Sequence, residues 1–549
     1  MKICLINSNF TEQIMPNFMV NFEAGLLSLA AVLEENRFKV KIINLYQLIK
    51  QKKIIADSFF CDNAARFIIE RGIDILGFNT RCDTYPIVLN IARKCKELNP
   101  SSIIILGGPQ STFTDLETLR EFPFIDVIVR GEGEQTLLDL MRLFKSYKDR
   151  NLKDVAGITY RKNDRIVQNK PRELIKDLDS LPMPAYHLVE DYFPAPDELK
   201  YGWIYISIGR GCPHNCTYCS TGKMWQKCYR LRSPRNILKE IKFLKKRYGI
   251  SRFYLGHDNF LTKKEDVIKL CNLLLQSKIG IKWTCSSRID SIDASVLKIM
   301  SESGCQRIFF GIESGSPKIQ KIIKKNIDVS VIPGRLKECE KYNIATALSF
   351  IVGFPEEKAE DLNATLGWAL KARLSRNSYS YIRLLMPMPS TTLFMKNRDR
   401  LVLRDSWNHL YLIGDLIKKV SWSKNLIKKY PLIFSSFYTI KLKYFSKNLP
   451  YEAVTTFSTL LCAYPMSSYI SLHELRISPL ILLQELKLWG KKKRLNRGKK
   501  AITLLRSLCL RYFPAFLEDM YKQKDISIKL VSHILNLEKK NCSDIYNKL

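Results

Sequence analysis

The sequence contains few histidines and no long apolar run. Only six of its 549 residues are histidine, and the first is His187. The N-terminal part of the chain therefore offers no imidazole ligand to a metal or cofactor. No stretch of about 18 uncharged apolar residues occurs, so no membrane-spanning helix is expected. The opening residues, Met1–Ser8, have the pattern of a strand rather than a signal peptide, which predicts a cytoplasmic protein.

Acidic residues are also scarce relative to basic ones. The chain has 53 Asp and Glu against 88 Lys and Arg, a net charge of +35. Such an excess attracts polyanions, including nucleic acids, anionic lipid surfaces and acidic peptides, and it does not choose among them. A proteome with a basic composition would give the same value.

Low-complexity tracts and regular repeats are absent too, and the composition is that of a globular protein, 46% hydrophobic. A chain of this length exceeds one ordinary core, which predicts two or three domains. Its 15 cysteines are mostly scattered. In a protein that is not secreted they are expected to be reduced and buried rather than paired in disulfides.

Three cysteines stand apart because they are close in sequence. Cys212, Cys216 and Cys219 form a CxxxCxxC motif. Three thiolates suit a soft metal or an iron–sulfur cluster, and in a four-iron cluster they leave one iron free for chemistry. A structural zinc site is the alternative, but it needs a fourth ligand, and the nearby candidates are only His214 and Cys228.

The motif, with the aromatic Tyr218 just before its last cysteine, resembles the signature of radical S-adenosylmethionine (SAM) enzymes. The resemblance implies a [4Fe–4S] cluster on Cys212, Cys216 and Cys219. It also implies that SAM binds the fourth iron and is cleaved to methionine and a 5′-deoxyadenosyl radical.

Residues 1–144 alternate apolar runs with amphipathic stretches. The pattern predicts strands at Lys2–Asn7, Val40–Leu45, Asp74–Asn79, Ser102–Leu106 and Asp126–Arg130, with helices such as Phe22–Glu35 and Tyr85–Leu98 between them. Strands joined by helical crossovers indicate a parallel, doubly wound α/β sheet of Rossmann or flavodoxin-like type. A ligand of such a sheet is expected at the carboxyl ends of its strands.

Two glycine-rich loops follow predicted strands in this region. They read GGPQST from Gly107 and RGEGE from Arg130. Ahead of the cysteine motif, they resemble the cobalamin-binding domain of cobalamin-dependent radical SAM enzymes. The resemblance implies cobalamin contacts at Thr80, Arg81, Gly107, Gly108, Pro109, Gln110, Gly131, Glu132, Gly133 and Glu134.

The loop from Asn7 to Asn21 departs from that family. Many of its members carry a histidine there that binds cobalt from below, and this loop has none. Any bound cobalamin is therefore expected without an imidazole lower ligand, and the loop Asn79–Cys82 is the candidate neighbour of the cobalt. An empty, cobalamin-like domain is the alternative.

Residues 145–200 are predicted to be a linker that contains a hairpin, Val155–Arg161 with Arg165–Asn169. Residues 201–392 alternate again, with strands predicted at Trp203–Ile208, Arg252–Leu255, Lys282–Ser286, Arg307–Phe310, Thr346–Val352 and Tyr379–Leu385. Six strand–helix units fit the partial (β/α)6 barrel of radical SAM enzymes, whose site lies at the carboxyl ends of the strands.

SAM has a cationic sulfonium, a ribose and an amino acid head, which call for a carboxylate, a guanidinium and backbone polar groups. Loops at the expected strand ends supply these, and GIESGS and GFPEE resemble the family's SAM-binding segments. The predicted SAM contacts are Tyr218, Asp258, Arg288, Glu313, Ser314, Gly353 and Pro355. His257 is either a proton donor or metal ligand or, as is commoner for such a residue, a local hydrogen-bonding partner.

Residues 393–549 resemble no named domain. Apolar residues at helical spacing, as in Leu480–Trp489 and Ile502–Phe513, predict a helical domain. From Thr391 onward there are 29 Lys and Arg against 11 Asp and Glu, and Lys491–Lys500 is the most basic run. This run is either a solvated connection between helices or a contact for an anionic substrate, carrier or lipid surface.

The combined resemblance implies a radical SAM enzyme with a [4Fe–4S] cluster, SAM and cobalamin. In the commonest family outcome, methylcobalamin methylates a substrate radical. Cyclisation or rearrangement without methyl transfer, a tRNA-modifying methylthiotransferase and a non-enzymatic cobalamin sensor are the alternatives. Expected partners are an electron donor such as flavodoxin or ferredoxin and an organic substrate, anionic, lipid or peptide. The basic tail suggests peripheral membrane contact, and nucleic acid is not an expected partner.

Overall fold

The computed structural model describes residues 1–10, 19–20, 23–146, 151–193, 202–404, 411–446, 448–495 and 501–546. Parts of the loop 7–21 and of the linker 145–200, with Phe22 and the second half of the basic run (residues 496–500), lie outside the described residues. The chain forms two compact units. The first unit comprises Met1–Asp258, Gln276–Lys282 and Met386–Thr439; the second comprises Asn259–Leu275, Trp283–Leu385 and Ile440–Leu549.

The N-terminal sheet of the first unit contains all five strands predicted there. They are β1 (Lys2–Asn7), β3 (Lys39–Asn44), β4 (Ile75–Asn79), β5 (Ile103–Gly107) and β6 (Val127–Val129). The strands are parallel in the order β3-β1-β4-β5-β6, the flavodoxin-like order, and the hairpin of β7 (Ile158–Lys162) and β8 (Arg165–Gln168) extends the sheet antiparallel. The strand order reverses between β1 and β4, so a ligand is expected at their carboxyl ends.

Helices cover this sheet because its strands are apolar on both faces; five of the six residues of β1 are buried. The helices of this part are α1 (Ala24–Glu35), α2 (Leu45–Lys50), α3 (Phe60–Ile69), α4 (Tyr85–Leu98), α5 (Pro109–Phe113), α6 (Asp115–Glu121) and α7 (Glu134–Lys145). α4 begins with Pro86 in its first turn, where a missing N–H costs no intrahelical bond.

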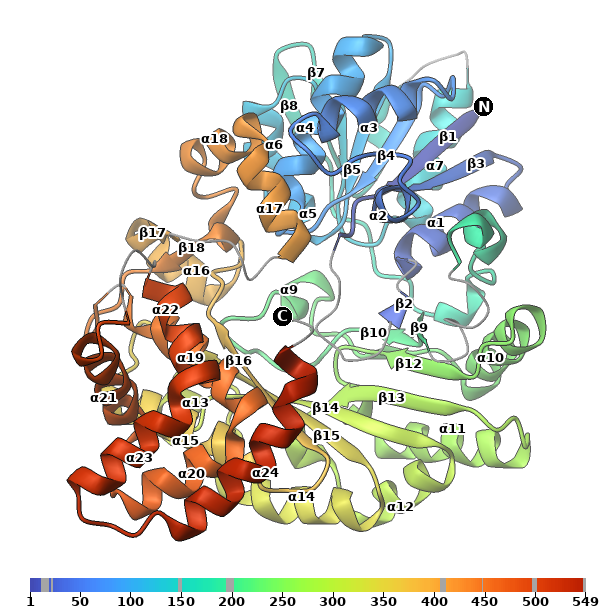
Figure 1. The fold of residues 1–549 in the computed structure, drawn as a ribbon. Helices are drawn as coiled ribbons and strands as arrows, with labels where there is room; N and C mark the ends of the chain where they lie inside the picture. The colour runs from blue at the N-terminus through green and yellow to red at the C-terminus, as the bar shows by residue number, and fades with distance from the viewer. Residues whose placement is uncertain are drawn as a thin grey trace. The chain divides into compact units, whose positions relative to one another are not determined.

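Two helices from much later in the chain complete the core of the first unit. α17 (Tyr411–Lys419) and α18 (Ser421–Lys429), orange in Figure 1, lie beside the blue helices of the N-terminal sheet. Ile413, Ile417 and Phe434 belong to the same buried cluster as Phe60 and Tyr85. The Ser423 hydroxyl donates a hydrogen bond to the Pro86 carbonyl at 3.0 Å. The sequence pattern gave no indication of this packing.

All six strands predicted after the linker are present. In the first unit β9 (Trp203–Ser207) pairs in parallel with β12 (Arg252–Gly256) and with the unexpected short strand β2 (Met19–Val20). In the second unit β13 (Lys282–Ser287), β14 (Cys305–Glu313), β15 (Ala345–Val352) and β16 (Ser378–Leu384) are neighbours in that order, all parallel. The helices between them are α10 (Pro234–Tyr248), α11 (Lys264–Gln276), α12 (Ala294–Glu302), α13 (Pro317–Ile322), α14 (Ile332–Lys341) and α15 (Ala359–Ala372).

The C-terminal part is helical, as predicted. It consists of α19 (Leu449–Ala463), α20 (Pro465–Glu474), α21 (Pro479–Lys492), α22 (Ala501–Ser507), a π-helical turn (Leu508–Tyr512), α23 (Phe513–Gln523) and α24 (Lys529–Tyr546). In sequence, α16 (Thr392–Asn397), β17 (Leu401–Leu403) and β18 (Tyr438–Ile440) come between the last barrel strand and these helices. No helix in the described ranges is long and apolar enough to cross a membrane.

Candidate active site

The cysteine motif lies in a loop that a short two-stranded ribbon closes. β10 (Gly209–Arg210) pairs antiparallel with β11 (Arg230–Leu231), and the intervening residues contain only the short helix α9 (Thr221–Met224). We call residues 211–229 the cysteine loop. Gly211 has a φ of +95°, and a Cβ there would lie 1.8 Å from the Cys228 carbonyl oxygen. Only glycine can therefore open this loop.

None of the three motif cysteines forms a disulfide, and all three are partly exposed. Burial raises the pKa of Cys212, and the neighbouring Cys219 and Cys216 raise it further, whereas the His214 backbone lowers it. Thiols that disfavour one another's ionisation are close enough to interact, and a bound cation would relieve that repulsion. Within the described ranges, however, no three His, Cys, Asp or Glu side chains already converge as metal ligands.

Asp258 and His257 follow β12 and lie beside the start of the loop. The Gly211 amide donates a hydrogen bond of 2.8 Å to the Asp258 carboxylate, and burial raises the pKa of that carboxyl group. Burial lowers the pKa of His257 to about 4, so its imidazole is neutral at pH 7. The His257 ring packs 4.6 Å from the ring of Tyr229. Tyr218 lies in the loop, partly exposed.

The predicted cobalamin loops lie at the carboxyl ends of β4, β5 and β6. Gly108 has a φ of +108°, and a Cβ there would come within 2.7 Å of the Thr80 carbonyl oxygen. The Thr80 hydroxyl donates to the Gly107 carbonyl at 2.8 Å. Gln110 is buried and donates to the Ile433 carbonyl at 2.7 Å. These contacts bring together the loops after β4 and β5, next to the point between β1 and β4 where the strand order reverses.

The other predicted residues of this group have partners in the same region. Arg81 forms an ion pair with Asp83 at 3.3 Å. The Gly131 amide donates to the Thr112 hydroxyl at 3.1 Å, and Gly131 has a φ of +72°. Pro109 begins α5, and Gly133 is the residue before α7.

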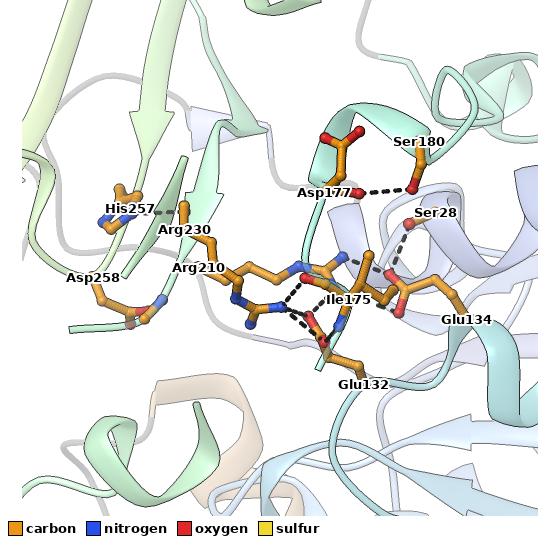
Figure 2. Close-up of polar contacts among 11 residues, drawn as sticks. Ser28, Glu132, Glu134, Ile175, Asp177, Ser180, Arg210, Arg230, His257 and Asp258 are labelled. Carbon is orange, nitrogen blue, oxygen red and sulfur yellow. Dashed lines mark hydrogen bonds and ion pairs between the residues drawn. The ribbon is translucent and has the colours of Figure 1, made fainter. Parts of the chain in front are cut away.

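The remaining two, Glu132 and Glu134, contact arginines that the sequence did not single out. Figure 2 shows the carboxylates facing Arg210 and Arg230 of the β10–β11 ribbon. Arg210 Nη1 lies 2.6 Å from Glu132 Oε1, and Arg210 Nη2 lies 2.5 Å from Glu134 Oε1. Arg230 Nη1 lies 3.0 Å from Glu132 Oε1. Burial alone would raise the pKa of Glu134, but the charge and hydrogen bonds of Arg210 hold it below its usual value.

The second unit carries the other predicted SAM contacts at the ends of its strands. Arg288 follows β13 and is buried; it binds the Asp290 carboxylate at 2.6 Å and the Lys325 carbonyl at 2.9 Å, while its Nη1 has no hydrogen-bonding partner among the described residues. Glu313 ends β14 with a φ of +72° and lies 3.3 Å from Lys325 Nζ. A positive φ at a non-glycine residue at a strand end is the kind of strain that clusters at functional sites.

Ser314 directly follows Glu313 in sequence, and the Gly353–Pro355 turn follows the next strand, β15. The Ser314 hydroxyl is 3.1 Å from that of Thr365. Gly353 follows β15 with a φ of +94°, and its amide donates to Glu357 Oε2 at 2.7 Å. Burial raises the pKa of Glu357 to about 8. A carboxyl group that is largely protonated at neutral pH therefore holds this turn.

Two family models match the chain. One, described as the radical SAM superfamily, covers residues 206–369. The other, described as a B12 binding domain, covers residues 20–141. The first runs from the end of β9 through the cysteine loop and β15 into α15, and the second covers the strands of the flavodoxin-order sheet after β1.

Curated relatives include methyltransferases and cyclases. An uncharacterised methyltransferase of Pyrococcus horikoshii is 32% identical over 74% of this chain and 85% of its own length. A cytidylyl-2-hydroxyethylphosphonate methyltransferase of Streptomyces wedmorensis is 26% identical over 69% of this chain and 78% of its own. An anaerobic magnesium-protoporphyrin IX monomethyl ester cyclase of Synechocystis is 29% identical, over 52% of this chain and 57% of its own.

Two solved structures have a similar fold. The radical SAM methyltransferase TsrM of Kitasatospora setae, with cobalamin and a [4Fe–4S] cluster bound, aligns with a TM-score of 0.58 at 16% identity, over 72% of this chain and 74% of that one. The cobalamin-dependent radical enzyme OxsB, with aqua-cobalamin and SAM bound, aligns with a TM-score of 0.61 at 16% identity, over 100% of this chain and 80% of that one. At such identities the likeness concerns the fold.

Proposed function

Because this chain belongs to the cobalamin-dependent radical SAM enzymes, we propose that it transfers a methyl group to an unactivated carbon atom of an organic substrate. The observation that carries the proposal is the match to a methyltransferase along 85% of that relative's length. A second methyltransferase relative is matched over 78% of its length. Each of these matches is long enough to include both family domains.

We propose that Cys212, Cys216 and Cys219 hold three irons of a [4Fe–4S] cluster. The three thiols share one glycine-opened loop; burial raises the pKa of Cys212, and Cys219 and Cys216 lie close enough to raise it further. Such a cluster, when bound, supplies the electron that cleaves SAM, and bound cobalamin supplies the methyl group.

For SAM itself we propose contacts from Tyr218, Asp258, Arg288, Glu313, Ser314, Gly353 and Pro355. The buried Arg288 has one nitrogen, Nη1, with no partner in the part of the chain that the structure describes, and it can donate to a carboxylate. Glu313 is held in a strained conformation with Lys325 against it, which presents an oriented acceptor. Asp258 fixes the start of the cysteine loop through the Gly211 amide.

For cobalamin we propose contacts from the loops after β4, β5 and β6, at Thr80, Arg81, Gly107, Gly108, Pro109, Gln110, Gly131 and Gly133. Gly108 lies so close to Thr80 that a side chain would not fit, which leaves flat backbone at the point where a ligand of this sheet order binds. Since the first histidine is His187, the lower face of the cofactor has no imidazole from this domain.

The reaction also needs a one-electron reductant and a substrate. We propose flavodoxin or ferredoxin as the donor, because radical SAM chemistry needs a low-potential electron. For the substrate we propose an anionic organic molecule, a lipid or a peptide, since the chain carries a net charge of +35.

Cyclisation without methyl transfer is the second candidate function. It is favoured by the cyclase relative of Synechocystis, although the chain spans only 57% of that protein's length. The two functions differ in their use of SAM, because only methyl transfer produces S-adenosylhomocysteine in addition to deoxyadenosine.

A single experiment tests the proposal. The full chain is purified anaerobically with iron, sulfide and cobalamin supplied, and is analysed for iron, cobalt and the products of SAM under reducing conditions. We expect deoxyadenosine formation that depends on reductant, and S-adenosylhomocysteine formation that depends on cobalamin. The variant Cys216→Ala should lose deoxyadenosine formation by at least about a thousandfold, because it removes a cluster ligand.

Two results would contradict this assignment. Deoxyadenosine formation that persists in Cys216→Ala would exclude the cysteine-bound cluster. S-adenosylhomocysteine absent from a protein that holds cobalamin and cleaves SAM would exclude methyl transfer and favour the cyclase function.

A further inference from the structure

The ion-paired cluster of Glu132, Glu134, Arg210 and Arg230, which we call the carboxylate clamp, joins two distant parts of the sequence. The two glutamates follow β6 in the flavodoxin-order sheet, and the two arginines form the ribbon that closes the cysteine loop. All four side chains are largely buried, with exposed fractions of 4% for each glutamate, 13% for Arg210 and 10% for Arg230. Water therefore screens these charges little.

The two arginines lie directly opposite one another, so the negative charges of the glutamates are required to offset the repulsion between them. Arg210 and Arg230 form a cross-strand pair in the β10–β11 ribbon. Two like charges in such a pair destabilise the strands that carry them. Glu132 contacts both guanidinium groups, and Glu134 contacts Arg210 (Figure 2). The two carboxylates thus neutralise a repulsion at the base of the cysteine loop.

Every carboxylate oxygen of the clamp is engaged by a protein donor. Glu132 Oε2 accepts from the Ile175 amide at 2.7 Å, and Glu134 Oε1 accepts from the Ser28 hydroxyl at 2.8 Å. Glu134 Oε2 lies 3.4 Å from Arg210 Nη1. As the first residue of α7, Glu134 is further stabilised by the helix N-terminus. Little acceptor capacity remains for a cofactor.

We infer that Glu132 and Glu134 are positioning residues that lock the base of the cysteine loop to the flavodoxin-order sheet, and that neither contacts cobalamin. Arg210 precedes Gly211 directly, so its anchored side chain fixes the backbone from which Cys212 follows. Arg230 fixes the other end of the loop, next to Tyr229. The inference rests on the proposed function, because the loop that these two glutamates position is the proposed cluster site.

The first test measures loop order in the full chain without iron, so it does not depend on activity. Hydrogen exchange is followed in peptides that cover residues 209–231 in the wild type and in Glu134→Gln. The variant keeps the shape of the side chain but leaves the buried Arg210 short of one negative charge. We expect exchange in these peptides to rise at least about tenfold, since a buried charge that loses its partner is strongly destabilised.

Two exposed residues provide matched controls. Glu121→Gln on α6 and Arg235→Gln on α10 remove one charge of each sign from the same unit without touching the clamp. Both should leave exchange in residues 209–231 within about twofold of the wild type, since surface charges contribute little to stability. Unchanged exchange in Glu134→Gln would overturn the positioning role.

If Glu134→Gln does not fold, the paired variant Glu134→Gln with Arg210→Gln keeps the inference testable. It removes one charge of each sign, so the unpaired guanidinium is no longer present. We expect the double variant to exchange more slowly in the loop than either single variant, or to fold where they do not. A loss equal to the sum of the single losses would show that the two residues act independently.

The second test separates the clamp from a cofactor contact. Cobalamin binding by Glu132→Gln and Glu134→Gln is titrated, and the reduced cluster is examined by electron paramagnetic resonance with and without SAM. We expect cobalamin affinity within about threefold of the wild type and an altered cluster spectrum, because only the loop geometry changes. Cobalamin affinity lowered more than about tenfold, with an unchanged cluster spectrum, would identify the glutamates as cofactor contacts instead.

Discussion

Gly211 decides the path of the cysteine loop. A Cβ at this position would lie 1.8 Å from the Cys228 carbonyl oxygen, and the φ of +95° disfavours any other residue. We expect Gly211→Ala to lower the bound iron per chain at least about fivefold, because the added methyl group would clash with the Cys228 carbonyl and prevent the loop from closing. Iron analysis of reconstituted protein checks this. Gly25→Ala, where a Cβ meets nothing within 4 Å, is the control and should retain its iron.

The Glu357 carboxyl group makes the free energy of unfolding of the second unit depend on pH. Burial raises the pKa of Glu357 from 4.5 to about 8 in the folded chain. Between these values the folded state holds a proton that the unfolded state has released, so the free energy of unfolding falls as pH rises and levels off above about pH 8. Denaturant unfolding of the wild type and Glu357→Gln between about pH 5 and 9 measures this. The same slope in both proteins would contradict the assignment.

At the scale of elements, α17 and α18 belong to the core around the N-terminal sheet, although they follow the last barrel strand in sequence. Ile417 is fully buried in the core that also contains Phe60 and Tyr85. We expect Ile417→Ala to lower the free energy of unfolding of the first unit by about 2–5 kcal/mol, through lost burial and the cavity that remains. Urea unfolding monitored by hydrogen exchange in β1 and β4 reports this loss.

Leu432 follows α18 in the segment Met386–Thr439 and is 44% exposed, so it provides the control. Leu432→Ala should change the free energy of unfolding by less than about 0.5 kcal/mol, as is usual for surface substitutions. Equal effects of the two substitutions would show that the segment does not belong to the core of the first unit.

The strands and most helices could be predicted from the sequence because their signals are local. Lys2–Asn7 and Tyr85–Leu98 are each a continuous apolar or amphipathic pattern, and the structure has elements with the same bounds. What could not be predicted depends on partners far apart in sequence. Neither β2 nor the packing of α18 on α4 has a local signature, and nothing near Glu132 in the sequence points to Arg230.

For the site, too, only the features with a local sequence signal could be predicted. CxxxCxxC and the glycine-rich loops identify themselves by spacing, whereas the proposed roles of their flanking charges depend on burial. The glycines on either side of Arg210 are the one local signal that its backbone is confined.

At the scale of the whole molecule, the positive charge is concentrated toward the C-terminal region. Lys491, Lys492 and Arg494 at the end of α21 are exposed, and Lys493 pairs with Asp519 at 3.0 Å. Basic residues near an anionic membrane contribute about 1 kcal/mol each. We therefore expect the variant with Lys491→Gln, Lys492→Gln and Arg494→Gln to bind vesicles that contain phosphatidylserine at least about tenfold more weakly.

Co-sedimentation with these vesicles at low salt measures the effect. A variant that loses Lys39, Lys52 and Lys53, all exposed in the first unit, carries the same net charge and should bind nearly as well as the wild type. Equal losses in both variants would assign vesicle binding to overall charge, and no loss in either would leave the run at α21 as a solvated connection.

The late position of α17 and α18 also bears on how the protein is made. A ribosome releases residues 1–144 long before it synthesises Met386–Thr439, yet both segments belong to one compact unit. Until then the nascent sheet domain exposes the apolar surface around Tyr85 and Phe122, to which Phe434 and Tyr430 later bind. The N-terminal domain should therefore depend on chaperones during translation, and a fragment ending near residue 144 should aggregate when expressed alone.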